Sequence, residues 1–124
     1  MRRHLLITLL AGTAALTAHA QFPMGNPKEA IVAGANATGQ TWQFASRCGT
    51  SADLLKQYRA RFDAETQEGR GKLYPSLGID IDAEFKKGQD VGNQFYDSVQ
   101  SAADRGRICK QTTELIQSIL ASKK

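Results

Sequence analysis

The chain has 124 residues with 16 basic and 12 acidic side chains, which gives a formal net charge of +4. This length allows one domain with a modest hydrophobic core. Acidic and basic residues are interleaved along the chain, so it has no basic stripe that could follow a phosphate backbone, and we expect no nucleic-acid partner.

The first twenty residues have the pattern of a bacterial export signal. Arginines at positions 2 and 3 precede an apolar run over residues 5–16, and small residues at positions 18 and 20 fit a cleavage site. The apolar run is too short for a membrane span. We therefore expect Sec-type cleavage near Ala20 and a single periplasmic or secreted domain over residues 21–124. Cleavage removes two basic residues and no acidic ones, so this domain has a net charge of about +2.

The chain has two cysteines, Cys48 and Cys109. Exported proteins pass into an oxidising compartment, where two cysteines usually form a disulfide. On the chain-entropy model, closing a loop of about 60 residues stabilises a fold by about 4 kcal/mol. We therefore expect a Cys48–Cys109 disulfide to be an important part of the stability of this small domain.

The first helix of the exported domain is predicted to begin after Asn26, which is a favourable N-cap, with Pro27 at the first helical position. It is expected to end at Gly49. Gly34 and Gly39 each weaken it by up to about 1 kcal/mol relative to alanine. The residues that recur at helical spacing on its inner face are Ile31, Ala35, Thr38, Trp42 and Ala45.

A second helix is predicted to begin at Thr50, which can form a capping pair with Asp53. It is expected to fray near residues 68–69. The turn over residues 49–51 is short, so the two helices should form an antiparallel hairpin. The predicted buried face consists of Leu54, Leu55, Tyr58 and Phe62.

Glycines and a proline over residues 69–79 predict a loop. Its apolar residues either cover the core or contact a partner. Arginine and tyrosine are common at binding hot spots, so we regard this loop as the candidate protein-binding site. The candidate residues are Arg70, Lys72, Leu73 and Tyr74.

The best-patterned region is residues 82–120, where small and apolar residues recur at intervals of three and four. Residues 103–106 are expected to end or bend its first helix, and a last helix is expected from 107 to about 121. Gly88 and Gly92 predict close helix packing, either within the chain or at a homodimer contact. The predicted fold is therefore all-α, a small four-helix bundle-like domain cross-linked by one disulfide.

Both histidines of the chain, at positions 4 and 19, lie in the predicted signal. Without histidine we expect no catalytic triad, no histidine-ligated metal or haem, and no cofactor. Asp80, Asp82 and Glu84 form the main acidic cluster, but Phe85 and Val91 stand where a calcium loop needs glycine and glutamate. We interpret these acids as helix caps.

These features favour a non-catalytic protein that binds another exported or periplasmic protein, of the inhibitor, immunity-protein or secretion-accessory type. The chain would be a monomer or a weak homodimer. One alternative is a periplasmic stress chaperone that opens in acid or on reduction. Another is a small-ligand carrier or an enzyme that uses carboxylates alone.

Overall fold

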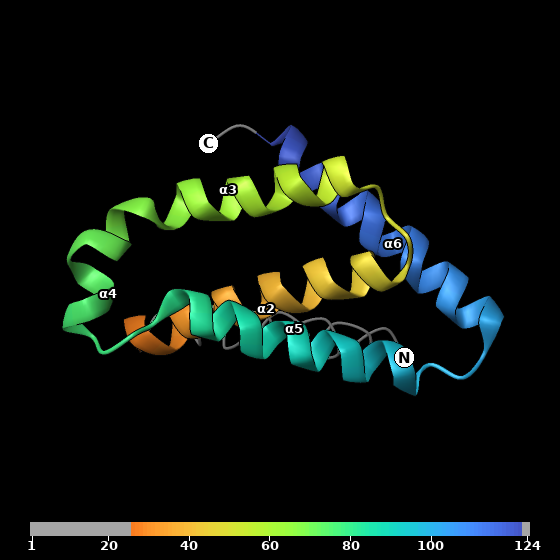
Figure 1. The fold of residues 1–124 in the computed structure, drawn as a ribbon, viewed down its shortest axis with the longest axis horizontal. Coiled ribbons are helices and arrows are strands. Elements are labelled where there is room, and N and C mark those ends of the chain that lie inside the picture. Colours follow the sequence, from red (N-terminus) through yellow and green to blue (C-terminus); the bar gives the residue numbers. More distant parts are fainter. Residues whose placement is uncertain (1–25, 123–124) are drawn as a thin grey trace, which may run out of the picture. The chain divides into compact units, whose positions relative to one another are not determined.

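The computed structural model describes residues 26–122, and all regular secondary structure in that range is helical. The all-α prediction is confirmed, as four long helices and one short one (Figure 1). The predicted signal and its cleavage site near Ala20 lie outside the described residues. No helix within residues 26–122 is both long enough and apolar enough to span a membrane. The helices are α2 (Pro27–Arg47), α3 (Ala52–Gly71), α4 (Leu73–Ser76), α5 (Ile81–Ser98) and α6 (Ala102–Ala121).

Helix α2 begins as its sequence predicts. The Asn26 side-chain oxygen accepts a hydrogen bond from the Glu29 backbone N–H at 3.3 Å, within the first turn. The helix continues unbroken through Gly34 and Gly39 to Arg47. Gly49 then adopts a φ of 81°, the left-handed conformation that glycine tolerates best and that commonly follows a helix.

Helix α3 differs from the prediction at both ends. Its N-cap is Ser51, whose hydroxyl accepts a hydrogen bond from the Leu54 N–H at 3.2 Å. The predicted cap, Thr50, instead shares a hydrogen bond with Thr113 of α6 at 3.2 Å. The helix also continues past residues 68–69 to Gly71, because contacts with other elements, described below, hold its last turn in place.

The boundary between the last two long helices was also predicted wrongly. The break lies at residues 99–101, and α6 begins after Ser101, whose hydroxyl accepts a hydrogen bond from the Asp104 N–H at 3.2 Å. Gly106 therefore lies inside α6, and a Cβ atom added there would meet nothing within 4 Å. Phe95 belongs to the small and apolar residues that recur at intervals of three and four over residues 82–120, yet it is 49% exposed.

Helices α2 and α5 lie side by side and run in the same direction (Figure 1). A Cβ atom added to Gly88 would lie 2.8 Å from the carbonyl carbon of Asn36 and would overlap its oxygen. One added to Gly92 would lie 2.6 Å from the Gln40 oxygen. Gly39 faces α5 in the same way. These glycines allow the two backbones to approach more closely than side chains would permit.

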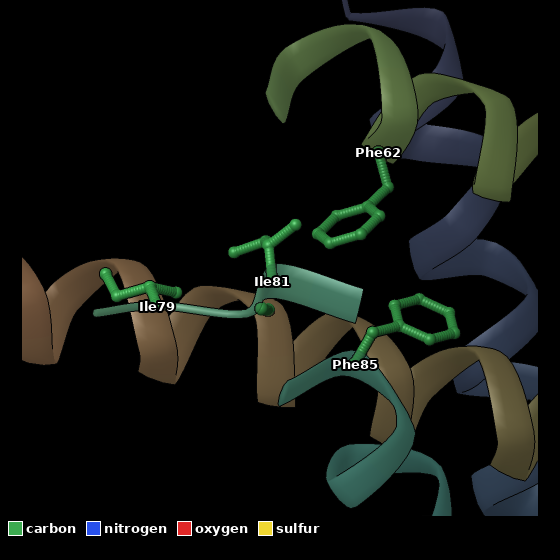
Figure 2. Close-up of a cluster of buried hydrophobic side chains, with 5 residues drawn as sticks. Phe62, Ile79, Ile81 and Phe85 are labelled. Atoms are coloured by element: carbon green, nitrogen blue, oxygen red, sulfur yellow. The ribbon is translucent and has the colours of Figure 1, made fainter. Parts of the chain in front are cut away.

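The core of residues 31–122 consists of two clusters. The first core cluster joins α2, α3, α5 and the segment after α4. Figure 2 shows Phe62 and Phe85 facing each other within it, with Ile81 next to Phe62 and Ile79 further along the same segment. The second core cluster joins α2, α3 and α6. Trp42 packs against both and donates a hydrogen bond from Nε1 to the Leu55 carbonyl at 3.1 Å. The buried members are Ala35, Phe62, Ile79, Ile81 and Phe85 in the first, and Ala45, Leu55, Tyr58 and Ile116 in the second.

The predicted disulfide is confirmed. Cys48, directly after α2, is bonded to Cys109 of α6, with 5.6 Å between their Cα atoms. The bond spans 61 positions of sequence and therefore ties α6 to the turn between α2 and α3.

Candidate binding groove

Three of the four candidate binding residues lie around one groove, at the corner between α3 and α4. Lys72, Leu73 and Tyr74 line it on the side of α4, and the groove has a volume of about 530 Å³. The last turns of α3 form its other side. Its full lining is Glu65, Glu68, Gly69, Lys72, Leu73, Tyr74 and Ser76.

The chain builds this corner from short-range interactions. Lys72 leaves the helical conformation and ends α3, and the single turn of α4 follows. The Ile79 N–H then bonds to the Tyr74 carbonyl at 2.9 Å, and Gly78 turns the chain with a φ of 69°. Ile79 is buried in the first core cluster, so the end of the corner is anchored in the core. The predicted loop is thus an ordered turn that contains one helical turn.

Tyr74 connects the groove to the core. It is partly buried against the first core cluster, and its ring lies directly over Gly69. A Cβ atom at Gly69 would lie 2.7 Å from Cε2 of the ring, so the ring fits only because this residue is glycine. Leu73, the adjacent residue, is 49% exposed. The corner therefore combines a fixed aromatic ring with a solvent-facing leucine.

Arg70 does not line the groove. Its guanidinium pairs in a bidentate manner with Asp82 of α5, with Nη1 2.7 Å from Oδ2 and Nη2 3.0 Å from Oδ1. Nη2 also lies 3.3 Å from Asp63, and Nε donates to the Thr66 hydroxyl at 3.0 Å. The hydrogen bonds between Arg70 and Asp82 raise the pKa of Arg70 and lower the pKa of Asp82. Arg70 therefore has a structural role, holding the last turn of α3 against α5.

Arg59 joins Arg70, Asp63 and Asp82 in one ionic cluster. It contacts Asp82 at 2.9 Å and Asp63 at 3.2 Å, and its guanidinium lies 4.1 Å from the centroid of the Phe85 ring. Guanidinium groups over aromatic faces are favourable when partly desolvated. The cluster joins α3 to the start of α5 on both sides of the corner, and so fixes the position of the α3 end that forms one wall of the groove.

The three acids at the start of α5 have separate structural partners. Asp80 caps the helix by accepting a hydrogen bond from the Ala83 N–H at 3.1 Å. Asp82 belongs to the ionic cluster, and Glu84 pairs with Lys87 at 3.0 Å. Residues 26–122 contain no group of three or more side chains suited to hold a metal ion. The arrangement of these acids matches caps and ion pairs, and they do not converge on a common point.

The groove itself presents few charges. Glu65 is paired with Arg61 at 2.5 Å, and Arg61 also donates to the Ile119 and Ser122 carbonyls at the end of α6. Glu68 and Lys72 are exposed, and neither forms an ion pair with another residue in the range 26–122. A partner would therefore meet one carboxylate and one ammonium group beside Leu73 and Tyr74.

Gly88 and Gly92 are not part of the groove. Their faces of α5 are covered by the backbone of α2, so the close packing at these positions is a contact within the chain. The homodimer contact considered for them would require this surface to be free.

The sequence patterns missed Glu65 and Glu68 as groove residues. Both precede Gly69 within one turn, and Glu68 lies four positions before Lys72, so helical spacing alone would have placed them next to the corner if α3 had been extended to its observed end.

No protein-family model, curated protein or solved structure matches the chain. We therefore infer the function from the geometry of the groove.

Proposed function

We propose that this chain is a non-catalytic protein that binds another exported protein through the α3–α4 groove. The observation that carries the proposal is Leu73, a 49% exposed leucine held next to a fixed tyrosine ring. Binding surfaces gain affinity when their contact residues are already in place, because little conformational entropy is then lost on association. Tyr74 meets this condition because it is packed between Gly69 and the first core cluster.

The groove restricts the kind of contact that a partner can make. Its volume of about 530 Å³ leaves room for several side chains of a partner, as in an anchor pocket within a larger interface. Leu73 and Tyr74 favour a large apolar side chain, while Glu68 and Lys72 favour polar or charged groups around it. A loop or helix of a folded protein that projects one apolar residue would fit this description.

The ligand-carrier and carboxylate-enzyme alternatives receive less support. The space between α2, α3 and α6, lined by Tyr58 and Ile119 among others, has a volume of about 120 Å³. Sites for drug-sized ligands usually measure about 300–1,000 Å³, so the interior of the bundle is too small for one. The α3–α4 groove lies within this range, but it is open to solvent. Asp80, Asp82 and Glu84 are each used by the fold, as described above, and do not converge as acid and base.

A photo-crosslinking experiment tests the proposal. A photoreactive phenylalanine analogue is placed at position 73, and the chain is expressed and exported in its native host. Position 115 provides the matched control, because Leu115 is also a leucine that is 49% exposed, but lies on α6. We expect a discrete crosslinked protein from position 73 that is absent from position 115.

The same crosslink should weaken when Lys72 and Glu68 are exchanged for residues of opposite charge in an otherwise unchanged chain. If position 73 gives no product, or gives the same products as position 115, the groove is not the binding surface and the proposal fails.

A further inference from the structure

Helix α6 buries few of its side chains against the rest of the chain. Ile116 is its one buried residue, at 0% exposure. Thr113 shares the hydrogen bond with Thr50, and Arg61 of α3 donates to two carbonyls at the helix end. The half-buried Ile119 and Leu120 pack against the second core cluster, and Cys109 provides a covalent connection. A helix with a single buried side chain has little packing of its own to keep it in place.

The surface beneath α6 is strongly apolar. The second core cluster contributes Ala45, Leu55 and Tyr58 from α2 and α3, all of them buried, with Leu54 beside them. These residues are covered in part by Ile116, Ile119 and Leu120 of α6. Displacement of α6 would therefore expose a continuous apolar face on the α2–α3 hairpin.

The other half of the core does not depend on α6. The first core cluster contains residues of α2, α3, α5 and the α4 segment, and none of α6. The close contact between α2 and α5 at Gly39, Gly88 and Gly92 likewise involves no residue of α6. The ionic cluster also lies between α3 and α5. These interactions would stay in place if α6 moved away.

The disulfide can be reached from solvent. Cys48 and Cys109 are both partly exposed, and they line an open hollow of about 420 Å³. One basic residue, Lys110, and one acidic residue line the same hollow, so an approaching thiolate meets no net charge there. The remaining lining residues are Gly49, Thr50, Thr113 and Glu114.

We propose that the disulfide controls the docking of α6, so that reduction of Cys48–Cys109 releases this helix and uncovers the second core cluster while α2, α3 and α5 stay folded. The reductant is a dithiol. Its first thiolate attacks one cysteine sulfur, breaks the S–S bond and forms a mixed disulfide; its second thiol then displaces the remaining cysteine. In total, the dithiol is oxidised by two electrons and Cys48 and Cys109 each gain one proton.

The direction of the effect follows from loop closure. The disulfide restricts the position of α6 relative to the turn after α2, so breaking it gives the connection through residues 99–101 much more freedom. The buried Ile116, the half-buried Ile119 and Leu120 and a few hydrogen bonds then have to hold the helix. This device goes beyond the proposed groove, which lies at the α3–α4 corner and shares no lining residue with the hollow around the disulfide.

Hydrogen exchange measured by mass spectrometry tests this proposal on the purified, oxidised protein with and without a dithiol. We expect amides of α6 to exchange on the order of 100-fold faster after reduction. Amides of α5 around Gly88 provide the internal control and should keep their protection. A dye that fluoresces on apolar surfaces should bind only after reduction.

A variant with Cys48→Ser and Cys109→Ser should show fast exchange in α6 without any dithiol, and should not respond when one is added. Equal loss of protection in α5 and α6, in the reduced protein or in this variant, would overturn the proposal, because the disulfide would then hold the whole fold. Unchanged exchange in α6 after complete reduction would overturn it as well.

Discussion

The contact between α2 and α5 gives the sharpest prediction about stability. Substituting Gly88→Ala adds one methyl group at the point where the two helices meet. The new carbon would lie 2.8 Å from the carbonyl carbon of Asn36. Ordinary contacts between carbon atoms are about 3.5–4.0 Å. The helices must therefore separate by about 1 Å at this position, since the opposing atoms belong to the backbone and cannot rotate away.

Two effects of opposite sign determine the magnitude. Alanine is a better helix former than glycine, which stabilises the fold by about 0.5–1 kcal/mol. Overpacking of a close contact costs about 1–3 kcal/mol, occasionally more. We expect the second effect to dominate, so that Gly88→Ala lowers the free energy of unfolding by about 1–2 kcal/mol. For a domain of this size, that corresponds to a decrease in Tm of roughly 5–15 °C.

Gly34→Ala is the matched control. Gly34 also lies inside a helix, α2, but a Cβ atom there would meet nothing within 4 Å. This substitution should raise the free energy of unfolding by about 0.5–1 kcal/mol. Both variants can be compared with the unmodified chain by urea unfolding followed by circular dichroism. If Gly88→Ala proves as stable as Gly34→Ala, α2 and α5 do not approach each other as closely at Gly88 as described.

Two further predictions concern side chains. Ile116→Ala should lower the free energy of unfolding by about 2–5 kcal/mol, because Ile116 is fully buried. Leu115→Ala, at an exposed neighbouring position, should change it by less than about 0.5 kcal/mol. Similar urea midpoints for the two variants would refute the placement of α6. The hydrogen bonds from Arg70 hold the pKa of the Asp82 carboxyl below its ordinary value of 3.8. The ionised carboxylate therefore stabilises the fold above that pH, and this contribution is lost as the pH falls through the lower pKa of the folded state. In Asp82→Asn the free energy of unfolding should therefore fall less steeply with decreasing pH below about pH 4. The difference should be less than about 1 kcal/mol, because the Asp82 side chain is 54% exposed. Parallel pH profiles of the two proteins in urea unfolding would contradict this.

The parts of the fold that the sequence predicts well depend on local signals or on elimination. Asn26 and Pro27 cap α2 through atoms three residues apart, and Gly49 ends it through its own backbone conformation. The disulfide follows because the chain has two cysteines. At the start of α3 the deciding contact is distant in sequence, and the prediction fails there. Thr50 and Ser51 are adjacent hydroxyl residues, and Thr50 is occupied by Thr113 of α6.

The boundary between α5 and α6 was predicted wrongly for a related reason, because Gly106 suggested a break in the helix. Gly106 weakens a helix by about 1 kcal/mol, yet α6 tolerates it because its cap lies at Ser101. The break at residues 99–101 contains no glycine or proline, so no strong local signal marks it.

The candidate site was predicted in part. Lys72, Leu73 and Tyr74 lie where the glycine-rich segment suggests an exposed surface. Arg70 was assigned to the same surface, but its orientation depends on Asp82, twelve residues further on and at the start of another helix. The geometry of α3 against α5 decides on which side of the corner that arginine lies, and no local pattern contains that information.

The glycine contact between α2 and α5 also limits how this chain can diverge. Surface residues can change freely over evolution, whereas positions 39, 88 and 92 can accept no larger residue without displacing a neighbouring backbone. A distant descendant with little remaining sequence identity should still carry glycine at these three positions, together with the two cysteines. That combination of five residues offers a way to recognise ancestry where overall similarity has been lost.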